Sequence, residues 1–226
     1  MKISFITTDS INEVWQNKLS LVKNSDLLLF GFNGLNLVSY KKELSGETEY
    51  FHDIAKLSKQ LSRVIICGCD TDNYGVYRHS AVIADSGKLL GVSDMVHVIG
   101  DTEFAPGGSF RVYDTTKGKI GVLILDDLFF PEASRVLALC DADIIVCVYK
   151  NLTDTMPITL IKANAFSNGV AHALCADNYY ALVDKCGKII TCGTNSLTTS
   201  YINLEKDYSL ISSRRRGFYK DFHSGY

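Results

Sequence analysis

The sequence predicts an α/β fold in which two mixed β-sheets pack together and helices cover their outer faces. Two observations indicate this class. Buried-strand runs alternate with segments of helical periodicity, and the order of elements in the first half returns in the second. Each half also ends in a similar hairpin, since residues 81–90 match residues 180–189 when one inserted residue is allowed. The repeat predicts one pseudo-symmetric domain over residues 1–226.

In the first half of the sequence, strands and helices are expected to alternate as far as the hairpin at residues 81–90. A capping box is expected at Ser10 and Glu13, whose side chains can each satisfy the other's backbone amide. Apolar residues then recur at helical spacing as far as Val22, and a second amphipathic helix is expected over 47–61. Strands are expected at 2–7, 26–30, 63–69, 77–84 and 88–92.

The second half repeats this plan. Helices are expected to begin at Pro131 and Pro157, because proline suits the first turn of a helix, and the first of them should end near Cys140. The polar segment 212–226 is expected to form a C-terminal arm. Strands are expected at 120–125, 143–149, 172–176, 181–184 and 188–190.

The overall composition excludes several classes of protein. Hydrophobic residues make up 46% and charged residues 21%, the net charge is −2, and no apolar run approaches the roughly 20 residues that span a bilayer. We therefore expect neither nucleic acid nor membrane as a partner. The seven cysteines lie mostly in apolar stretches, which favours a cytoplasmic location without disulfides. The spacing of the histidines and cysteines predicts no metal site, and no motif predicts a cofactor.

One segment is specific enough to indicate a family. Residues 118–132, Gly-Lys-Ile-Gly-Val-Leu-Ile-Leu-Asp-Asp-Leu-Phe-Phe-Pro-Glu, resemble the stretch around the nucleophilic cysteine of carbon–nitrogen hydrolases of the nitrilase superfamily. Residues 80–91, the Pro106-Gly107 pair and residues 215–219 resemble further motifs of that family in the same order. The resemblance implies a four-layer α-β-β-α sandwich over nearly the whole chain.

The same resemblance implies that the catalytic residues have been replaced. In the family, a cysteine attacks the substrate carbon, a glutamate takes the thiol proton, and a lysine stabilises the developing negative charge. The corresponding positions hold Phe32, Met95 and Leu125. Exchange of a buried ionic cluster for packed apolar side chains is often neutral or stabilising, so we expect a pocket converted into core. The chain is thus predicted to be a pseudoenzyme that acts by binding or assembly.

Two alternatives stay open at this stage. The chain could be an active, amidase-like hydrolase, or a small-molecule sensor that uses a remodelled pocket. The candidate polar residues for such a pocket are Glu103, Asp126 and Asp127. Glu103 stands where many family members carry a substrate-positioning glutamate, but an exposed loop residue is the simpler interpretation. Asp127 is expected to cap the turn or the helix near Pro131 rather than to act in catalysis.

The expected partner is a second copy of the chain. In the family, subunits commonly pair through the helix that here begins at Pro131, so the resemblance implies a homodimer. The arm from Arg214 onward could reach the partner subunit. The apolar stripe expected on this helix consists of Ala133, Val136, Leu137 and Cys140.

Overall fold

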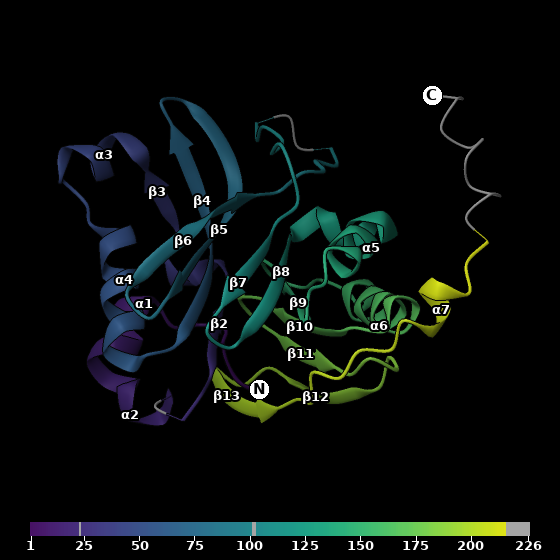
Figure 1. Ribbon diagram of the computed structural model, residues 1–226. Helices are drawn as coiled ribbons and strands as arrows, with labels where there is room; N and C mark the ends of the chain where they lie inside the picture. The colour runs from purple at the N-terminus through teal and green to yellow at the C-terminus, as the bar shows by residue number, and fades with distance from the viewer. Residues whose placement is uncertain (23, 101–102, 216–226) are drawn as a thin grey trace.

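Two β-sheets pack face to face, with helices on both outer faces (Figure 1). The structure is a computed structural model and describes residues 1–22, 24–100 and 103–215. Helices α1 (Ile11–Glu13), α2 (Leu19–Val22) and α4 (Tyr50–Leu61) cover the first sheet. Helices α5 (Pro131–Leu139) and α6 (Met156–Asn168) cover the second. The predicted α-β-β-α sandwich is therefore confirmed.

The first sheet follows the order β13-β1-β2-β4-β5-β6, and a short strand, β3, pairs with the far end of β4. The two long strands β4 and β5 form its largest hairpin, in which Asp70 lies opposite His79. The strands are β1 (Lys2–Ile6), β2 (Leu27–Phe30), β3 (Leu37–Ser39), β4 (Val64–Asn73), β5 (Val76–Asp85), β6 (Lys88–Asp94) and β13 (Leu197–Tyr201).

The second sheet follows the order β12-β11-β10-β9-β8-β7. Its central strands β8, β9 and β10 run parallel to one another. The strands are β7 (Val112–Thr115), β8 (Gly118–Ile124), β9 (Ile144–Val148), β10 (Ala171–Cys175), β11 (Tyr180–Val183) and β12 (Ile189–Gly193).

The two sheets have the same internal pairing. From β13 to β6 the neighbouring strands pair antiparallel, parallel, parallel, antiparallel and antiparallel. From β7 to β12 the succession is identical. The closing hairpins even share a register irregularity, between Ile83 and Ala84 in one and between Leu182 and Val183 in the other. The predicted internal pseudo-symmetry is thus confirmed at the level of strand register.

Alternate residues of the central strands point to opposite sides, so each strand contributes to two apolar layers. In β2, Leu27 and Leu29 face the other sheet, while Leu28 and Phe30 face the helices. In β9, Ile144 and Val146 face the first sheet, while Ile145 faces α5 and α6. Continuous apolar runs are therefore required in these strands, because both of their faces are buried.

Several element boundaries differ from the sequence-based expectation. The capping box at Ser10 and Glu13 is present, but a π-helical stretch, η1 (Val14–Lys18), joins α1 to α2. Helix α4 begins at Tyr50 rather than at residue 47. The reason is that Glu43 of the preceding helix, α3 (Tyr40–Ser45), accepts hydrogen bonds from the amides of Tyr50 and Phe51. A side chain outside the helix thus supplies its N-terminal cap.

The elements absent from the sequence-based prediction are short, and β13 among them depends on a distant partner. Strand β13 pairs with β1 across almost the whole chain, with Lys2 opposite Tyr201. The predicted C-terminal arm begins inside the short helix α7 (Ser209–Ser212), and its residues 216–226 lie outside the described residues. Within the described ranges, every helix is too short or too polar to cross a bilayer.

Candidate functional site

Phe32 lies in a short turn at the end of β2, where the resemblance places a catalytic glutamate. The turn Phe32–Gly34 follows β2, and the Phe32 side chain is only 4% exposed. Its ring packs over Gly68 of β4, where an added Cβ would lie 2.8 Å from the ring atom Cδ2. The ring of His79 meets it edge-on, with centroids 5.9 Å apart. Gly68 therefore leaves the space that an aromatic side chain needs at position 32.

Met95 follows directly after β6, where the resemblance places a catalytic lysine. Its side chain is 2% exposed. Its main chain is held from two sides: the amide donates to the carbonyl of His79 at 2.8 Å, and the carbonyl accepts from the amide of Gly107 at 2.7 Å. The methionine side chain is thereby directed into the interior by the main chain on either side of it.

Leu125 lies at the sharp turn between β8 and the 3₁₀ helix Leu125–Phe129, where the resemblance places the nucleophilic cysteine. Its φ angle is +45°, in the left-handed region that a branched side chain rarely adopts. Its side chain is 8% exposed. The turn at this position is therefore strained, and leucine carries no nucleophilic atom.

Phe32, Met95 and Leu125 belong to one apolar cluster between the two sheets, together with residues of β1, β2 and β8. Positions 32 and 125 are 93 residues apart in the sequence, yet all three side chains are buried in the same cluster. The interior at this place is occupied by apolar side chains. That the three positions correspond to a catalytic triad stays a prediction from the sequence pattern.

Asp127 has a different role from the predicted helix cap. Its carboxylate accepts hydrogen bonds from the amides of Val96 and His97, at 3.1 and 2.9 Å. The His97 ring also approaches Oδ1 through Nδ1 at 3.1 Å and stacks on Phe130, with centroids 3.8 Å apart. The N-cap residue of α5 is Phe130, and the Asp127 carboxylate bonds to Val96 and His97 instead, so the prediction that Asp127 caps this helix or its turn was wrong. Burial raises the pKa of Asp127, and the bonds from His97 and Val96 oppose this rise.

The other two polar candidates lie at the surface of this region. The Asp126 carboxylate accepts a hydrogen bond from the amide of Ile99 at 2.9 Å, in an exposed position. Glu103 is exposed, as expected for a loop glutamate. Both therefore differ from Asp127, which is 1% exposed, and neither is placed in the apolar cluster.

Sequence analysis did not identify a polar cluster that borders Phe32. Asp70 lies opposite His79 in the β4–β5 hairpin, and His79 Nδ1 is 2.6 Å from Asp70 Oδ1. Lys150, which follows β9 in the other sheet, donates to Asp70 Oδ2 at 3.0 Å. Phe104 stacks on His79 with a centroid distance of 3.7 Å. The only sequence signal was the hairpin register, which could have paired Asp70 with His79 but not with Lys150.

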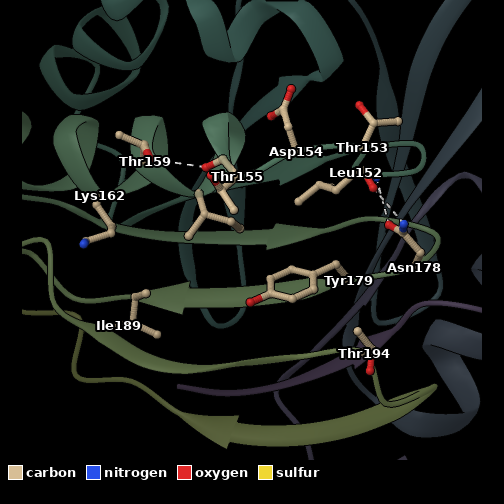
Figure 2. Close-up of a pocket in the computed structure, with 11 residues that line it drawn as sticks. Leu152, Thr153, Asp154, Thr155, Thr159, Lys162, Asn178, Tyr179, Ile189 and Thr194 are labelled. Atoms are coloured by element: carbon tan, nitrogen blue, oxygen red, sulfur yellow. Dashed lines mark hydrogen bonds between the residues drawn. The ribbon is translucent and has the colours of Figure 1, made fainter.

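One open cleft lies elsewhere, at the N-terminal end of α6 over β11 and β12 (Figure 2). Its volume is about 490 Å³. A hydrogen bond with Cys192 and burial raise the pKa of Tyr179 in this cleft to about 12. Neighbouring Leu152, Ile158 and Tyr179 pack on the outer apolar layer beneath α5 and α6, so the cleft is on the opposite side of the second sheet from Phe32.

The helical face expected to pair with a second subunit is only partly available. Ala133 and Leu137 of α5 are 0% and 1% exposed, because they pack on their own sheet. The predicted stripe is therefore wrong for these two residues. Val136 and Cys140 are exposed, and the apolar side chains of Leu139 and Phe166 add to them on the same outer layer.

Comparison with known proteins agrees with this architecture. The carbon–nitrogen hydrolase family model matches residues 7–209. A probable nitrilase of Schizosaccharomyces pombe is 30% identical over 169 residues, which cover 70% of this chain and 62% of that protein. An N-carbamoylputrescine amidase of Arabidopsis thaliana is 37% identical over 98 residues, 40% of this chain and 33% of that protein. The chain thus matches less than two thirds of the length of these relatives.

Solved structures extend the likeness to the whole fold. A carbon–nitrogen hydrolase from Helicobacter pylori superposes with a TM-score of 0.80 at 19% identity, covering 100% of this chain and 98% of that one. A nitrilase-superfamily member from Saccharomyces cerevisiae gives a TM-score of 0.77 at 17% identity, covering 96% of each chain. The family model spans most of the sequence and the fold is the same throughout; the chain therefore belongs to the carbon–nitrogen hydrolase family of the nitrilase superfamily.

Proposed function

We propose that this chain does not carry out thiol-dependent C–N hydrolysis and acts instead through binding, as one subunit of a homodimer. One observation carries the proposal: the side chains at the three positions expected for the catalytic residues, Phe32, Met95 and Leu125, are apolar and buried in a single cluster. None of them can donate or accept a proton or attack a carbonyl carbon.

The cysteines nearest the core do not offer a substitute nucleophile. Cys69, Cys147 and Cys175 are fully buried, and burial raises the pKa of each thiol. The thiolate is the reactive form of cysteine, so these groups are unreactive at neutral pH. Cys175 instead lies with Sγ 3.5 Å from the carbonyl oxygen of Ile6, where it packs as a small apolar residue.

The binding role is supported by the exposed apolar side chains on the α5–α6 layer. Val136 and Leu139 of α5 and Phe166 of α6 are 42%, 53% and 58% exposed, and large exposed apolar side chains favour contact with another protein. Arg135 Nη2 donates to the carbonyl of Ser167 at 3.0 Å and so joins the two helices into one surface. Two copies of such a surface could bury each other's apolar groups around a two-fold axis.

The test of the catalytic part is an activity panel. Purified protein is incubated with simple amides, carbamoyl amines and nitriles, with and without prior alkylation by iodoacetamide, beside an active family amidase. We expect no turnover above buffer in either sample. Turnover that iodoacetamide abolishes would overturn the proposal, and serine variants of the exposed Cys140, Cys186 and Cys192 would then locate the thiol.

A second candidate function is binding of a small molecule beside the filled pocket. The observation in its favour is the Asp70–His79–Lys150 cluster, which places charged groups against Phe32 although the interior behind them is apolar. Such a chain would be a sensor that retains a ligand site without the hydrolytic reaction. An amide substrate consumed without a thiol would favour the remaining alternative, an active hydrolase with a remodelled site.

A further inference from the structure

The ammonium group of Lys150 occupies a place that is built for a cation. Its Nζ is 3.0 Å from Asp70 Oδ2, 5.2 Å from the centroid of the Phe32 ring and 5.4 Å from that of the Phe104 ring. A cation within about 6 Å of an aromatic face is attracted by the ring quadrupole. Two rings and one carboxylate thus surround a single ammonium group.

The residues around this ammonium group are also held by contacts that do not involve Lys150. Asp70 is held by His79 on its other oxygen, at 2.6 Å, and the two residues are directly paired across β4 and β5. Phe104 stacks on the His79 ring with an interplanar angle of 17°, and the main chain next to it is bonded to β5 through Ala105. Phe32 lies against Gly68. Preorganisation of this kind lowers the cost of binding.

Asp70 carries the negative charge that the site requires. Burial raises the pKa of Asp70, but the hydrogen bonds from His79 and Lys150 outweigh this effect, and the pKa lies below its ordinary value. The carboxylate is therefore ionised at neutral pH. Its side chain is 25% exposed and that of His79 is 7% exposed, so the charge is only partly screened by water.

Lys150 differs from the other components because it reaches the site from elsewhere. It follows β9 of the second sheet, whereas Asp70 and His79 belong to the first, and its side chain is 38% exposed. Withdrawal of this side chain would break no strand pairing. Lys150 is thus placed as a tethered occupant of a site formed by other residues.

We propose that Asp70, Phe32 and Phe104 form a binding site for a primary alkylammonium group, which Lys150 fills in the absence of a ligand. A small molecule with a free primary amine has the required chemistry. The ammonium protons bond to Asp70 and the positive charge faces the two rings. This inference rests on the second candidate function, whose ligand class it names, and cation recognition at this site can hold or fail independently of the absence of thiol chemistry.

The test removes the tethered occupant and supplies it in solution. Lys150→Ala deletes a fragment equivalent to n-propylammonium, so the melting temperature of this variant is measured against n-propylammonium chloride at constant ionic strength. We expect the melting temperature to rise with n-propylammonium concentration and then to saturate. The dissociation constant should be on the order of millimolar, as is usual for so small a ligand. n-Propanol, which has the same number of non-hydrogen atoms and no charge, should give no such rise in melting temperature.

Matched variants separate the site from general salt effects. Lys119→Ala deletes an ammonium that pairs with Asp141 at 3.0 Å and that faces no aromatic ring of the described residues, and it should show no saturable response. Adding Asp70→Asn to Lys150→Ala should weaken n-propylammonium binding about tenfold or more, as expected for loss of a charge-assisted hydrogen bond. An equal response in Lys119→Ala, or an unchanged one in the double variant, would overturn the proposal.

A measurement on the unaltered protein covers the case in which Lys150→Ala does not fold. With ¹³C-labelled lysine, the Cε methylene protons of Lys150 should resonate upfield of the other lysines because of the two rings. Added n-propylammonium should move this signal toward the ordinary lysine position as it displaces the side chain. A Lys150 signal at the ordinary position from the outset, or one that n-propylammonium leaves unmoved, would contradict the site.

Discussion

The Asp127 carboxylate accepts a hydrogen bond from the main-chain amide of His97, with Oδ1 and N 2.9 Å apart. This contact ties the turn that carries Leu125 to the segment that carries Met95, because Asp127 and His97 each follow those residues by two positions. Asp127 therefore holds together the two segments that carry Leu125 and Met95. Both of these side chains are apolar.

We expect Asp127→Ala to lower the free energy of unfolding by about 1–3 kcal/mol, because the part-buried amides of Val96 and His97 would lose their acceptor. The measurement is urea denaturation. Asp126→Ala is the matched control, since Asp126 bonds one amide in an exposed position, and its effect should be clearly smaller. Equal effects of the two substitutions would contradict the assigned role of Asp127.

Gly68→Ala should destabilise the protein by about 1–3 kcal/mol, the usual cost of overpacking a core. The reason is that the added Cβ would lie 2.8 Å from the Phe32 ring. Combining Gly68→Ala with Phe32→Leu should cost less than the sum of the two single changes. Gly108→Ala is the control, because a Cβ there meets nothing within 4 Å. Strict additivity in the denaturation cycle would show that the ring and the glycine do not constrain each other.

Restoring the family's reactive groups should fail. The triple change Phe32→Glu, Met95→Lys and Leu125→Cys places two charges where the present side chains are 4% and 2% exposed. Each buried ion costs several kcal/mol unless it is well hydrogen-bonded, against a whole-domain stability of about 5–15 kcal/mol. We expect a lower melting temperature and no amide turnover.

Leu125→Cys alone serves as the reference for the triple variant. It should be milder, because it adds a thiol to the strained turn without a base to ionise it. If the triple variant were as stable as the parent and hydrolysed an amide, the interior would not be the closed core that the proposed function requires.

His172 should make the protein less stable in mild acid. Burial lowers the pKa of His172 from 6.5 to about 4, although its bond to the carbonyl of Val170 opposes the change. Between about pH 4 and 6.5 the unfolded chain binds more protons at this residue than the folded chain does. The free energy of unfolding therefore rises with pH over this window. The stabilising contribution of neutral His172 is complete above about pH 6.5 and is reduced by about 3 kcal/mol toward pH 4.

The variant His172→Gln isolates this contribution from that of the carboxylates. Glutamine does not titrate, so the difference between parent and variant should itself change with pH over that window. The measurement is urea denaturation at several pH values. A difference that is constant from pH 4 to 7 would exclude His172 as the source.

The proposed homodimer should depend on the α5–α6 surface. Leu139→Glu and Phe166→Glu place charges at side chains that are 53% and 58% exposed, where the subunits are expected to meet, and should give monomers at micromolar concentration. Light scattering measures the mass. Leu44→Glu on α3, whose side chain is 76% exposed on the opposite outer layer, should remain dimeric (Figure 1). A monomeric parent protein would rule out the dimer.

The sequence alone was sufficient to predict the fold class, the repeated strand order and the positions of the long buried strands. Its continuous apolar runs are typical of strands that are buried on both faces. The two hairpins have similar turn residues, and a turn depends on residues that are close in the sequence. From the sequence, Phe32, Met95 and Leu125 were also expected to lie in the core. These features depend on local periodicity or on motif order, both of which a single sequence records.

Only the tertiary structure decided which polar groups meet. Lys150 pairs with Asp70 across 80 positions of the chain and across two sheets, and β13 pairs with β1 at the opposite end of the sequence. Asp127 bonds amides about 30 residues earlier instead of capping the helix that follows it. Hydrogen bonds and ion pairs act over a few ångströms, so their partners are set by how the two sheets pack, which local sequence patterns do not encode.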